Sequence, residues 1–194
     1  MGYMSEPFLI AGLGNPGARY EATRHNVGFM AIDEVAENHM GSFSVHKKSN
    51  AEILETRIGD TKVVLAKPRT FMNLSGGPIR ALCDFFKIPP TNVIVIHDEL
   101  DLDFGTVRLK KGGGENGHNG LRSTSASLGT KDYLRIRIGI GRPPGRQDPA
   151  SYVLKPFSLQ EAAALGAICA DAAEGATLIV ERGLEFAQNT IHAK

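Results

Sequence analysis

Short runs of hydrophobic residues alternate along the chain with amphipathic stretches, a pattern typical of a protein built from both strands and helices. An apolar run at 8–14 ends in a Gly-Asn-Pro-Gly turn and predicts a buried strand. The strongest strand is predicted at 92–100, in NVIVIHDEL. Two further runs, at 51–58 and 61–68, flank a Gly-Asp pair and predict a β-hairpin.

Helical periodicity appears in three regions. Spaced apolar residues at 26–40 predict an amphipathic helix that ends near Gly41. A second helix is predicted at 74–87, with Pro78 tolerated in its first turn. The Ala-rich tail at 158–187 has two Gly interruptions and predicts two helices or one kinked helix.

Two later segments, 105–111 and 133–141, alternate polar and apolar residues as half-exposed strands do. Strands alternating with helices, together with a hairpin, indicate an α/β fold. We therefore expect a single domain over residues 1–194, with a twisted, mostly parallel mixed sheet flanked by helices.

Composition narrows the class of protein. The hydrophobic fraction of 42% and the charged fraction of 22% are those of an ordinary globular protein. No apolar stretch is expected to reach the length of a membrane span, and the opening MGYMSEPF does not resemble a secretory signal. Cys83 and Cys169 lie far apart and read as buried thiols of a reducing compartment, which favours the cytoplasm.

A glycine motif after the first strand invites a nucleotide-binding interpretation. GLGNPG fits the dinucleotide fingerprint G-x-G-x-x-G at Gly12, Gly14 and Gly17. However, Pro16 removes an amide from the loop that would cradle phosphate, and no helix is predicted to follow at once. No nucleotide cofactor is therefore expected.

Polar side chains follow several of the predicted strands. Each has an ordinary structural explanation: Asn15 as a turn residue, Asn73 as a helix cap, Asp98 as a turn cap, and His118-Asn119 as part of a glycine-rich loop. Because sites in open α/β sheets gather beyond the carboxyl ends of the strands, the set is expected on one rim.

The heptapeptide TRHNVGF places His25 at the mouth of the first predicted helix. Capping and surface polarity would explain the polar residues there, whereas a histidine with an ordinary pKa near 6.5 can also act as a general base at neutral pH. A carboxylate such as Asp98 could hold the imidazole in the correct tautomer. No serine or cysteine lies in a nucleophile setting, so attack by water is the natural inference.

A metal centre is the competing use of His25, His97, Asp98 and His118. The spacing lacks H-x-x-x-H and H-E-x-x-H, so no metal site is predicted. 

Basic residues alternate on two of the predicted strands. Arg108 and Lys110 share one face, as do Arg135 and Arg137, and the net charge of the whole chain is only +1. These faces are either solvated surfaces balanced by acids or a clamp for phosphates.

Five ordered motifs resemble those of the bacterial-type peptidyl-tRNA hydrolases, and the resemblance covers nearly the whole chain. They are GLGNPGARYEATRHNVGF, KPRTFMNLSG, VIVIHDELDLDFG, GGGENGHNGLRS and YLRIRIGIGRP. The resemblance implies a monomeric cytoplasmic enzyme without metal or organic cofactor, which hydrolyses the ester between a peptide and the terminal ribose of tRNA. Its partner is peptidyl-tRNA, with no membrane and no stable protein partner implied.

The same resemblance assigns roles to individual residues. It implies that His25 is the general base, that Asp98 supports it, and that Asn15 helps to distinguish a blocked aminoacyl group from a free one. Contacts with the substrate and the tRNA end are implied for Tyr20, Phe71, Met72, Asn73, His118 and Asn119. Basic residues matching those that grip tRNA phosphates are Arg108, Lys110 and Arg137.

The chain departs from the family's usual pattern at Glu115-Asn116, which brings an acidic residue near the expected RNA path. Two other hypotheses remain beside the ester hydrolase. One is an RNA-binding protein without catalysis that uses the same basic faces, and the other is a metallohydrolase of small molecules.

Overall fold

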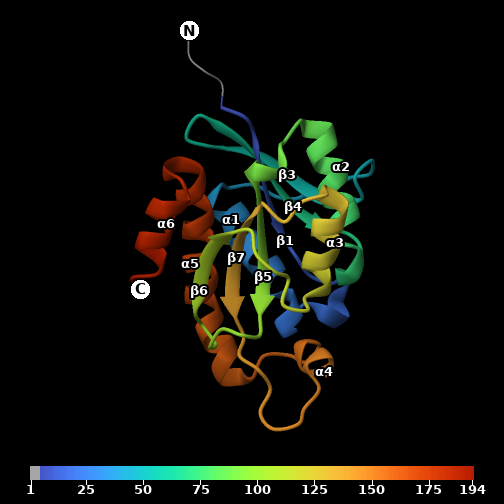
Figure 1. The fold of residues 1–194 in the computed structure, drawn as a ribbon, viewed down its shortest axis with the longest axis vertical. Helices are drawn as coiled ribbons and strands as arrows, with labels where there is room; N and C mark the ends of the chain where they lie inside the picture. The colour runs from blue at the N-terminus through green and yellow to red at the C-terminus, as the bar shows by residue number, and fades with distance from the viewer. Residues whose placement is uncertain (1–4) are drawn as a thin grey trace.

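The strands form one mixed sheet that runs through the molecule, with helices on both faces (Figure 1). The computed structural model describes residues 5–194, and in this range the sheet has seven strands in the order β2-β3-β4-β1-β5-β7-β6. The strands are β1 (Phe8–Gly12), β2 (Ser44–His46), β3 (Ala51–Ile58), β4 (Thr61–Pro68), β5 (Val93–Glu99), β6 (Val107–Lys111) and β7 (Leu134–Gly139).

The four central strands are parallel and the outer strands are antiparallel. β1 pairs in parallel with β4 and β5, and β5 pairs in parallel with β7. β2, β3 and β4 form an antiparallel meander, and β6 is antiparallel to β7. The predicted mixed α/β sheet with a mostly parallel core is confirmed, and the carboxyl ends of its central strands share one edge.

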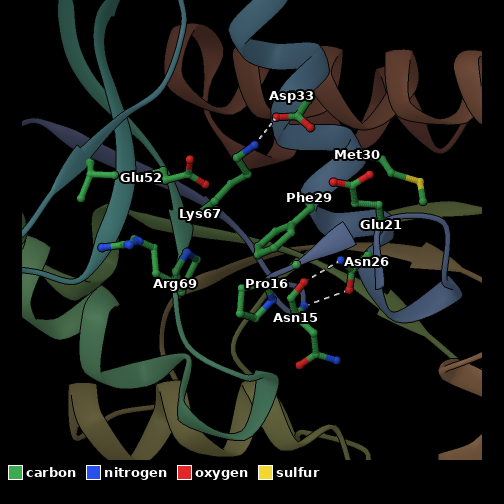
Figure 2. A pocket seen from close by; sticks show the side chains of 13 residues that line it. Asn15, Pro16, Glu21, Asn26, Phe29, Met30, Asp33, Glu52, Lys67 and Arg69 are labelled. Carbon is green, nitrogen blue, oxygen red and sulfur yellow. Dashed lines mark hydrogen bonds and ion pairs between the residues drawn. The ribbon is translucent and has the colours of Figure 1, made fainter. Parts of the chain in front are cut away.

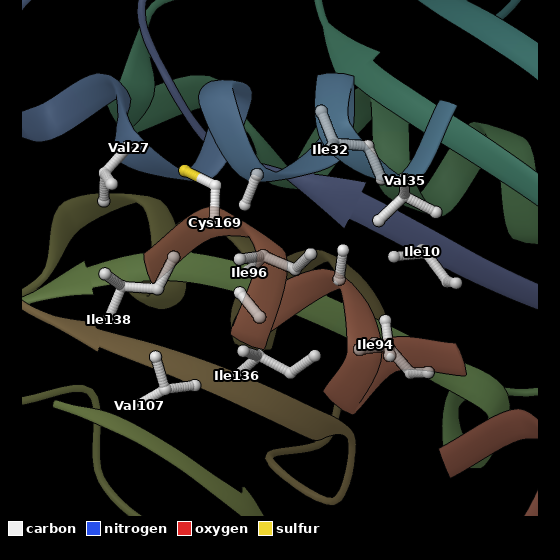
Figure 3. Close-up of a cluster of buried hydrophobic side chains, with 14 of the residues drawn as sticks. Ile10, Val27, Ile32, Val35, Ile94, Ile96, Val107, Ile136, Ile138 and Cys169 are labelled. Carbon is white, nitrogen blue, oxygen red and sulfur yellow. The ribbon is translucent and has the colours of Figure 1, made fainter. Parts of the chain in front are cut away.

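Helices cover the two faces of this sheet. α1 (Val27–Asn38), α5 (Leu159–Arg182) and α6 (Leu184–Ile191) pack on one face, where the aliphatic side chains of β5 and β7 meet α1 and α5 (Figure 3). α2 (Gly76–Phe86) and α3 (Asn119–Leu128) pack on the other face. The short α4 (Pro149–Val153) lies beyond the carboxyl edge of the sheet (Figure 1).

One expectation about apolar segments was wrong. Among residues 5–194, α5 is long and apolar enough to cross a membrane by length and composition alone. In the fold its Ala172, Ala176 and Ile179 are buried, and it packs against α1, α6 and β7 as a core helix does. The interpretation of MGYMSEPF as lacking a secretory signal rests partly on residues 1–4, which lie outside the described range.

Most predicted elements are confirmed. The hairpin joins β3 to β4, the helices at 26–40 and 74–87 are α1 and α2, and the tail divides into two helices at Gly183. Both cysteines are unpaired and buried. The sequence analysis did not predict β2, α3 or α4. α3 has low hydrophobicity and many Ser and Thr, and β2 and α4 are too short for periodicity to reveal.

The glycines of the nucleotide-like motif have a packing role in this fold. A Cβ on Gly12 would collide with the carbonyl oxygen of Gly28, and a Cβ on Gly28 would collide with the carbonyl oxygens of Ile96 and Leu13. A Cβ on Gly14 would come within 2.7 Å of the Phe29 ring. These glycines let the first turn of α1 lie directly against β1 and β5.

The substitution Gly28→Ala is expected to lower the free energy of unfolding by about 1–3 kcal/mol, because a methyl group must displace backbone on two sides. Gly166→Ala is the matched control, since this helical glycine on α5 has open space around it and alanine favours the helix. Urea unfolding of both variants measures the difference. Equal stability of Gly28→Ala and the wild type would contradict the packing role.

Candidate active site

His25 lies on a segment that is fixed by a distant part of the chain. It sits in a single turn of 3₁₀ helix, η2 (Arg24–Asn26), directly before α1. The Arg24 amide donates to the Lys155 carbonyl at 3.1 Å, and the Arg24 guanidinium pairs with Glu161 at 3.0 Å. The same guanidinium stacks on the Tyr152 ring, 4.0 Å from its centre. These contacts of Arg24 hold the His25 segment against α4 and α5.

The Asp98 carboxylate at the end of β5 lies between two imidazoles. His25 Nδ1 is 2.7 Å from Asp98 Oδ2, and His118 Nε2 is 2.8 Å from Asp98 Oδ1. The Asp98 side chain is only 2% exposed, so both of its oxygens depend on these two partners. His118 is the residue just before α3. The ends of η2, β5 and α3 therefore meet at one carboxylate.

The hydrogen bonds assign the tautomers of the two neutral histidines. His118 Nδ1 accepts from the Leu121 amide at 3.2 Å, which leaves Nε2 to carry the proton that it donates to Asp98. Asp98 as a carboxylate can only accept, so His25 Nδ1 carries a proton as well. His25 Nε2 is then an unprotonated nitrogen, and no side chain or backbone group in residues 5–194 hydrogen-bonds to it.

The electrostatics of this cluster favour a charged carboxylate. Burial alone would raise the pKa of Asp98, but the His25 and His118 imidazoles hold it well below its usual range. Burial also opposes charge on His25, yet the Asp98 charge and its hydrogen bond outweigh this and raise the pKa of His25 above 6.5. The neighbouring His97 is fully buried, and burial together with the nearby His118 lowers its pKa to about 3.

Asn15 is held in place by Asn26. The backbone N–H of Asn15 donates to Asn26 Oδ1 at 2.9 Å (Figure 2). The side-chain NH₂ of Asn26 donates to the backbone carbonyl of Asn15, also at 2.9 Å. Asn15 Oδ1 accepts from the Met72 amide at 2.7 Å, so the NH₂ group of Asn15 remains to contact a ligand. Asn26 occupies the N-cap position of α1 but its side chain makes no capping bond, because both ends of that side chain bind the Asn15 backbone.

Two connected cavities open on His25. One of about 310 Å³ is lined by the catalytic candidates His25 and Asp98, by residues 116–119 and by part of α4. The other, of about 290 Å³, lies over Asn15, Phe71, Met72 and Asn73. Four residues line both cavities, namely His25, Asn119, Ala150 and Val153.

The largest cavity is not the one that contains the histidines. It measures about 660 Å³ and lies beyond Asn15 and Pro16, where Lys67 pairs with Asp33 at 2.7 Å (Figure 2). No histidine in residues 5–194 is among those that line it. The cavities beside His25 are therefore the candidate active site, because titratable groups and cavity coincide there.

The histidine–aspartate cluster has the donor set of a cation site as well. Nitrogen or oxygen atoms of His25, Asp98 and His118 all lie within 4.8 Å of one another. A cation there would replace the two hydrogen bonds to Asp98 and would need His118 to lose its Nε2 proton, while its Nδ1 is occupied by the Leu121 amide. The present geometry suits proton transfer directly.

Comparison with known proteins agrees with this arrangement. The family model described as peptidyl-tRNA hydrolase matches residues 9–194. The peptidyl-tRNA hydrolase of Rhodococcus erythropolis is 61% identical over 95% of this chain and 97% of its own length. Peptidyl-tRNA hydrolase 1 of Corynebacterium glutamicum is 59% identical over 93% of this chain and 98% of its own length.

A solved structure extends the likeness to the whole fold. The crystal structure of peptidyl-tRNA hydrolase from Acinetobacter baumannii superposes with a TM-score of 0.91 at 34% identity, covering 100% of this chain and 98% of that one. The chain belongs to the peptidyl-tRNA hydrolase family. It is therefore an ester-bond hydrolase.

The residues that the resemblance to this family singles out lie in two places. The residues expected to contact the substrate and the tRNA end line the two cavities, with the exception of Tyr20. Tyr20 instead packs edge-to-face on Phe71, with 6.2 Å between ring centres. Asn73 is exposed and does not cap α2, whose N-cap position is Ser75. His118, expected to contact substrate, is also the second partner of Asp98.

The basic residues form a separate cluster on β6 and β7. Arg108 lies opposite Arg137 and Lys110 lies opposite Arg135, so all four side chains share one face of the sheet. Arg135 is fully buried and donates to the Gly114 carbonyl at 2.7 Å, so it supports the glycine-rich loop. Burial and neighbouring cations lower the pKa of Lys110. Burial also lowers the pKa of Arg137, and its Nε has no partner in residues 5–194.

Several residues at the cavity were not singled out by sequence reasoning. Glu99 is buried beside Asp98 and accepts from Asn116 at 3.1 Å, while Glu115 pairs with Lys131 at 3.4 Å. The acidic departure from the family pattern is thus neutralised locally.

α4 closes one side of the cavity. The sequence Asp148-Pro149 marks the start of this helix, because Asp caps helices and Pro favours their first turn.

Proposed function

We propose that this protein hydrolyses the ester bond between a peptide, or an N-blocked aminoacyl group, and the terminal ribose of tRNA. The observation that carries the proposal is the hydrogen bond of His25 Nδ1 with the buried Asp98, which leaves Nε2 without a partner in residues 5–194 on a side chain that lines two cavities. Membership of the peptidyl-tRNA hydrolase family supports the choice of substrate.

In the proposed reaction His25 Nε2 takes a proton from a water molecule as the water oxygen adds to the ester carbonyl carbon. Asp98 stabilises the imidazolium that forms, because its carboxylate is held 2.7 Å from Nδ1. The carbonyl oxygen becomes an oxyanion, for which the amides of Asn73 and Asn119 are the candidate donors. The bond to the ribose oxygen then breaks, and His25 returns its proton to that oxygen.

Asn15 is placed to read the acyl group next to the scissile bond. Its carboxamide oxygen is occupied by the Met72 amide, so its NH₂ group can donate to the carbonyl of a peptide or formyl group. A free aminoacyl group has an ammonium at that position and offers no acceptor. We infer that this contact favours N-blocked substrates.

The basic cluster of Arg108, Lys110 and Arg137 is proposed to hold phosphates of the tRNA. Their like charges lie together on one face, and burial and mutual repulsion lower the pKa of Lys110. An incoming phosphate relieves that repulsion and accepts charge-assisted hydrogen bonds. The cytoplasmic location and the monomeric state remain predictions.

Hydrolysis of an N-blocked aminoacyl-tRNA, beside the unblocked form, tests the proposal directly. We expect the wild type to cleave only the blocked form, with and without a chelator. Tight tRNA binding without cleavage would favour the non-catalytic RNA-binding hypothesis instead. Activity lost to the chelator and restored by zinc would favour metal chemistry at the histidine–aspartate cluster.

The variant Arg137→Ala is expected to weaken tRNA binding about tenfold, as the loss of one charge-assisted contact of roughly 1.5 kcal/mol predicts. The rate with saturating substrate should change little, and the dependence of binding on salt should become less steep. Filter binding over a salt series, together with steady-state kinetics, measures both effects.

Arg57→Ala is the matched control, because Arg57 is on β3, near the edge of the sheet opposite to β6. The kcat/KM for full-length peptidyl-tRNA is compared with that for a minimal ester, in the wild type and in Arg137→Ala. If the two substrates have equal kcat/KM in both proteins, Arg137 has no part in binding tRNA.

A further inference from the structure

The backbone of β6 has one free side, because this strand is the last in the sheet and pairs only with β7. In an antiparallel pair the polar backbone groups of successive residues point alternately toward the partner strand and away from it. Those of Leu109, which lies opposite Ile136, point away from β7. An edge of this kind ordinarily faces water or attracts another strand.

Two side chains at the end of α6 bind this edge. The Leu109 amide donates to His192 Nε2 at 2.9 Å, and Gln188 Nε2 donates to the Leu109 carbonyl at 2.9 Å. Because residues four apart lie on the same side of a helix, one face of α6 supplies both bonds. The Arg108 guanidinium donates to the next outward carbonyl, that of Val107, at 3.1 Å.

Leu109 lies between Arg108 and Lys110, two of the three basic residues of β6. The side chains of Arg108 and Lys110 point to the opposite face from Leu109, and Arg108 lies opposite Arg137. Whatever fixes the Leu109 backbone therefore fixes the strand that presents both cations. A small shift of β6 would move Arg108 and Lys110 relative to Arg137.

His192 can hold the Leu109 amide only while it is neutral, since a protonated imidazole has no free acceptor. Burial, and then the charges of Arg108 and Arg137, lower the pKa of His192 and so favour this neutral form. On the α5 side Lys194 binds Asp171 at 3.2 Å and Glu174 at 3.0 Å.

We propose that Gln188 and His192 are positioning residues for tRNA binding, which act by holding β6 at Leu109 so that Arg108 and Lys110 stand in register with Arg137. This inference rests on the proposed function of the basic cluster. The two residues touch no substrate, and their effect is on affinity for tRNA rather than on the chemical step.

The test compares His192→Ala, Gln188→Ala and His192→Gln with the wild type at about pH 8, where histidine is neutral. Each protein is assayed with full-length peptidyl-tRNA and with a minimal ester that lacks the acceptor stem. Binding of uncharged tRNA is measured separately. Asn189→Ala is the matched control, because Asn189 is exposed on the same helix.

We expect each alanine variant to raise KM for full-length peptidyl-tRNA and Kd for uncharged tRNA by about three- to tenfold, the effect of one lost hydrogen bond. The kcat and the kinetics with the minimal ester should stay unchanged. His192→Gln should restore the wild-type KM, because the glutamine oxygen can accept from the Leu109 amide.

An unchanged KM and Kd in both alanine variants would overturn the inference, as would an equal loss of kcat on both substrates or a failure of His192→Gln to restore binding. If the wild type itself cleaved no peptidyl-tRNA, the proposed function would fall. The Kd for uncharged tRNA would then decide the positioning role alone.

Discussion

Replacing His25 by alanine is expected to lower kcat for the cleavage of N-blocked aminoacyl-tRNA by roughly 10²- to 10⁴-fold, the usual contribution of a general base. The expectation rests on the free Nε2, because no other neutral imidazole nitrogen at the cavity is available. His118 uses both of its ring nitrogens, one on Asp98 and one on the Leu121 amide. His97 is fully buried.

The affinity for tRNA should survive in His25→Ala, since the basic cluster on β6 and β7 is untouched. Single-turnover cleavage and binding of uncharged tRNA separate the two quantities. His39→Ala, which removes a histidine at the far end of α1, is the matched control and should leave both unchanged. A rate for His25→Ala within a few-fold of the wild type would remove this residue from the role of base.

The periodicity of the chain was sufficient to predict the central strands and the longest helices. Continuous apolar runs such as that of β5 are typical of strands buried on both faces, and β5 is buried along its whole length. The hairpin of β3 and β4 follows from its two-residue Gly-Asp turn. α3 was missed because it is rich in Ser and Thr and contains few apolar residues, although Leu121 and Leu128 are buried.

The glycine motif shows why a pattern of letters cannot assign a site by itself. Gly12, Gly14 and Gly28 are required where α1 crosses closely over the ends of β1 and β5. A phosphate-binding loop would need small residues for a different reason, the approach of a ligand to the backbone. Pro16 argued against that function in the sequence, and the packing explains Gly12, Gly14 and Gly28.

The site was predictable as a set of residues and not as a set of contacts. Strand ends brought Asn15 and Asp98 to one edge of the sheet, yet the hydrogen bond between His25 and Asp98 joins residues 73 positions apart. The second imidazole on Asp98 depends on the Leu121 amide, which fixes the tautomer of His118. A single sequence does not encode such a contact in any spacing, because it arises only when α3 packs against β5.

The variant Asp98→Asn is expected to lower kcat/KM for peptidyl-tRNA by roughly 10²- to 10⁴-fold, even though it keeps the size of the side chain. The carboxylate accepts a hydrogen bond from each of two imidazoles, at 2.7 Å and 2.8 Å. A carboxamide has a single acceptor oxygen, so its NH₂ group must face a second N–H donor. The Leu121 amide occupies His118 Nδ1, so His118 must keep its proton on Nε2. His25 therefore changes tautomer: its Nδ1 accepts from the NH₂ group of the carboxamide and its Nε2 carries the proton.

The pH profile of kcat/KM separates this role from a loss of packing. In the wild type, burial opposes charge on His25 but the Asp98 anion raises its pKa above 6.5, so activity should fall as pH drops through that raised value. Asp98→Asn removes the anion and leaves the burial, and the acid limb should therefore move to lower pH while the plateau falls. Asp101→Asn, which alters an exposed carboxylate beyond the end of β5, should change neither. A reduced plateau with an unmoved acid limb would mean that Asp98 supports the fold of the cleft and not the basicity of His25.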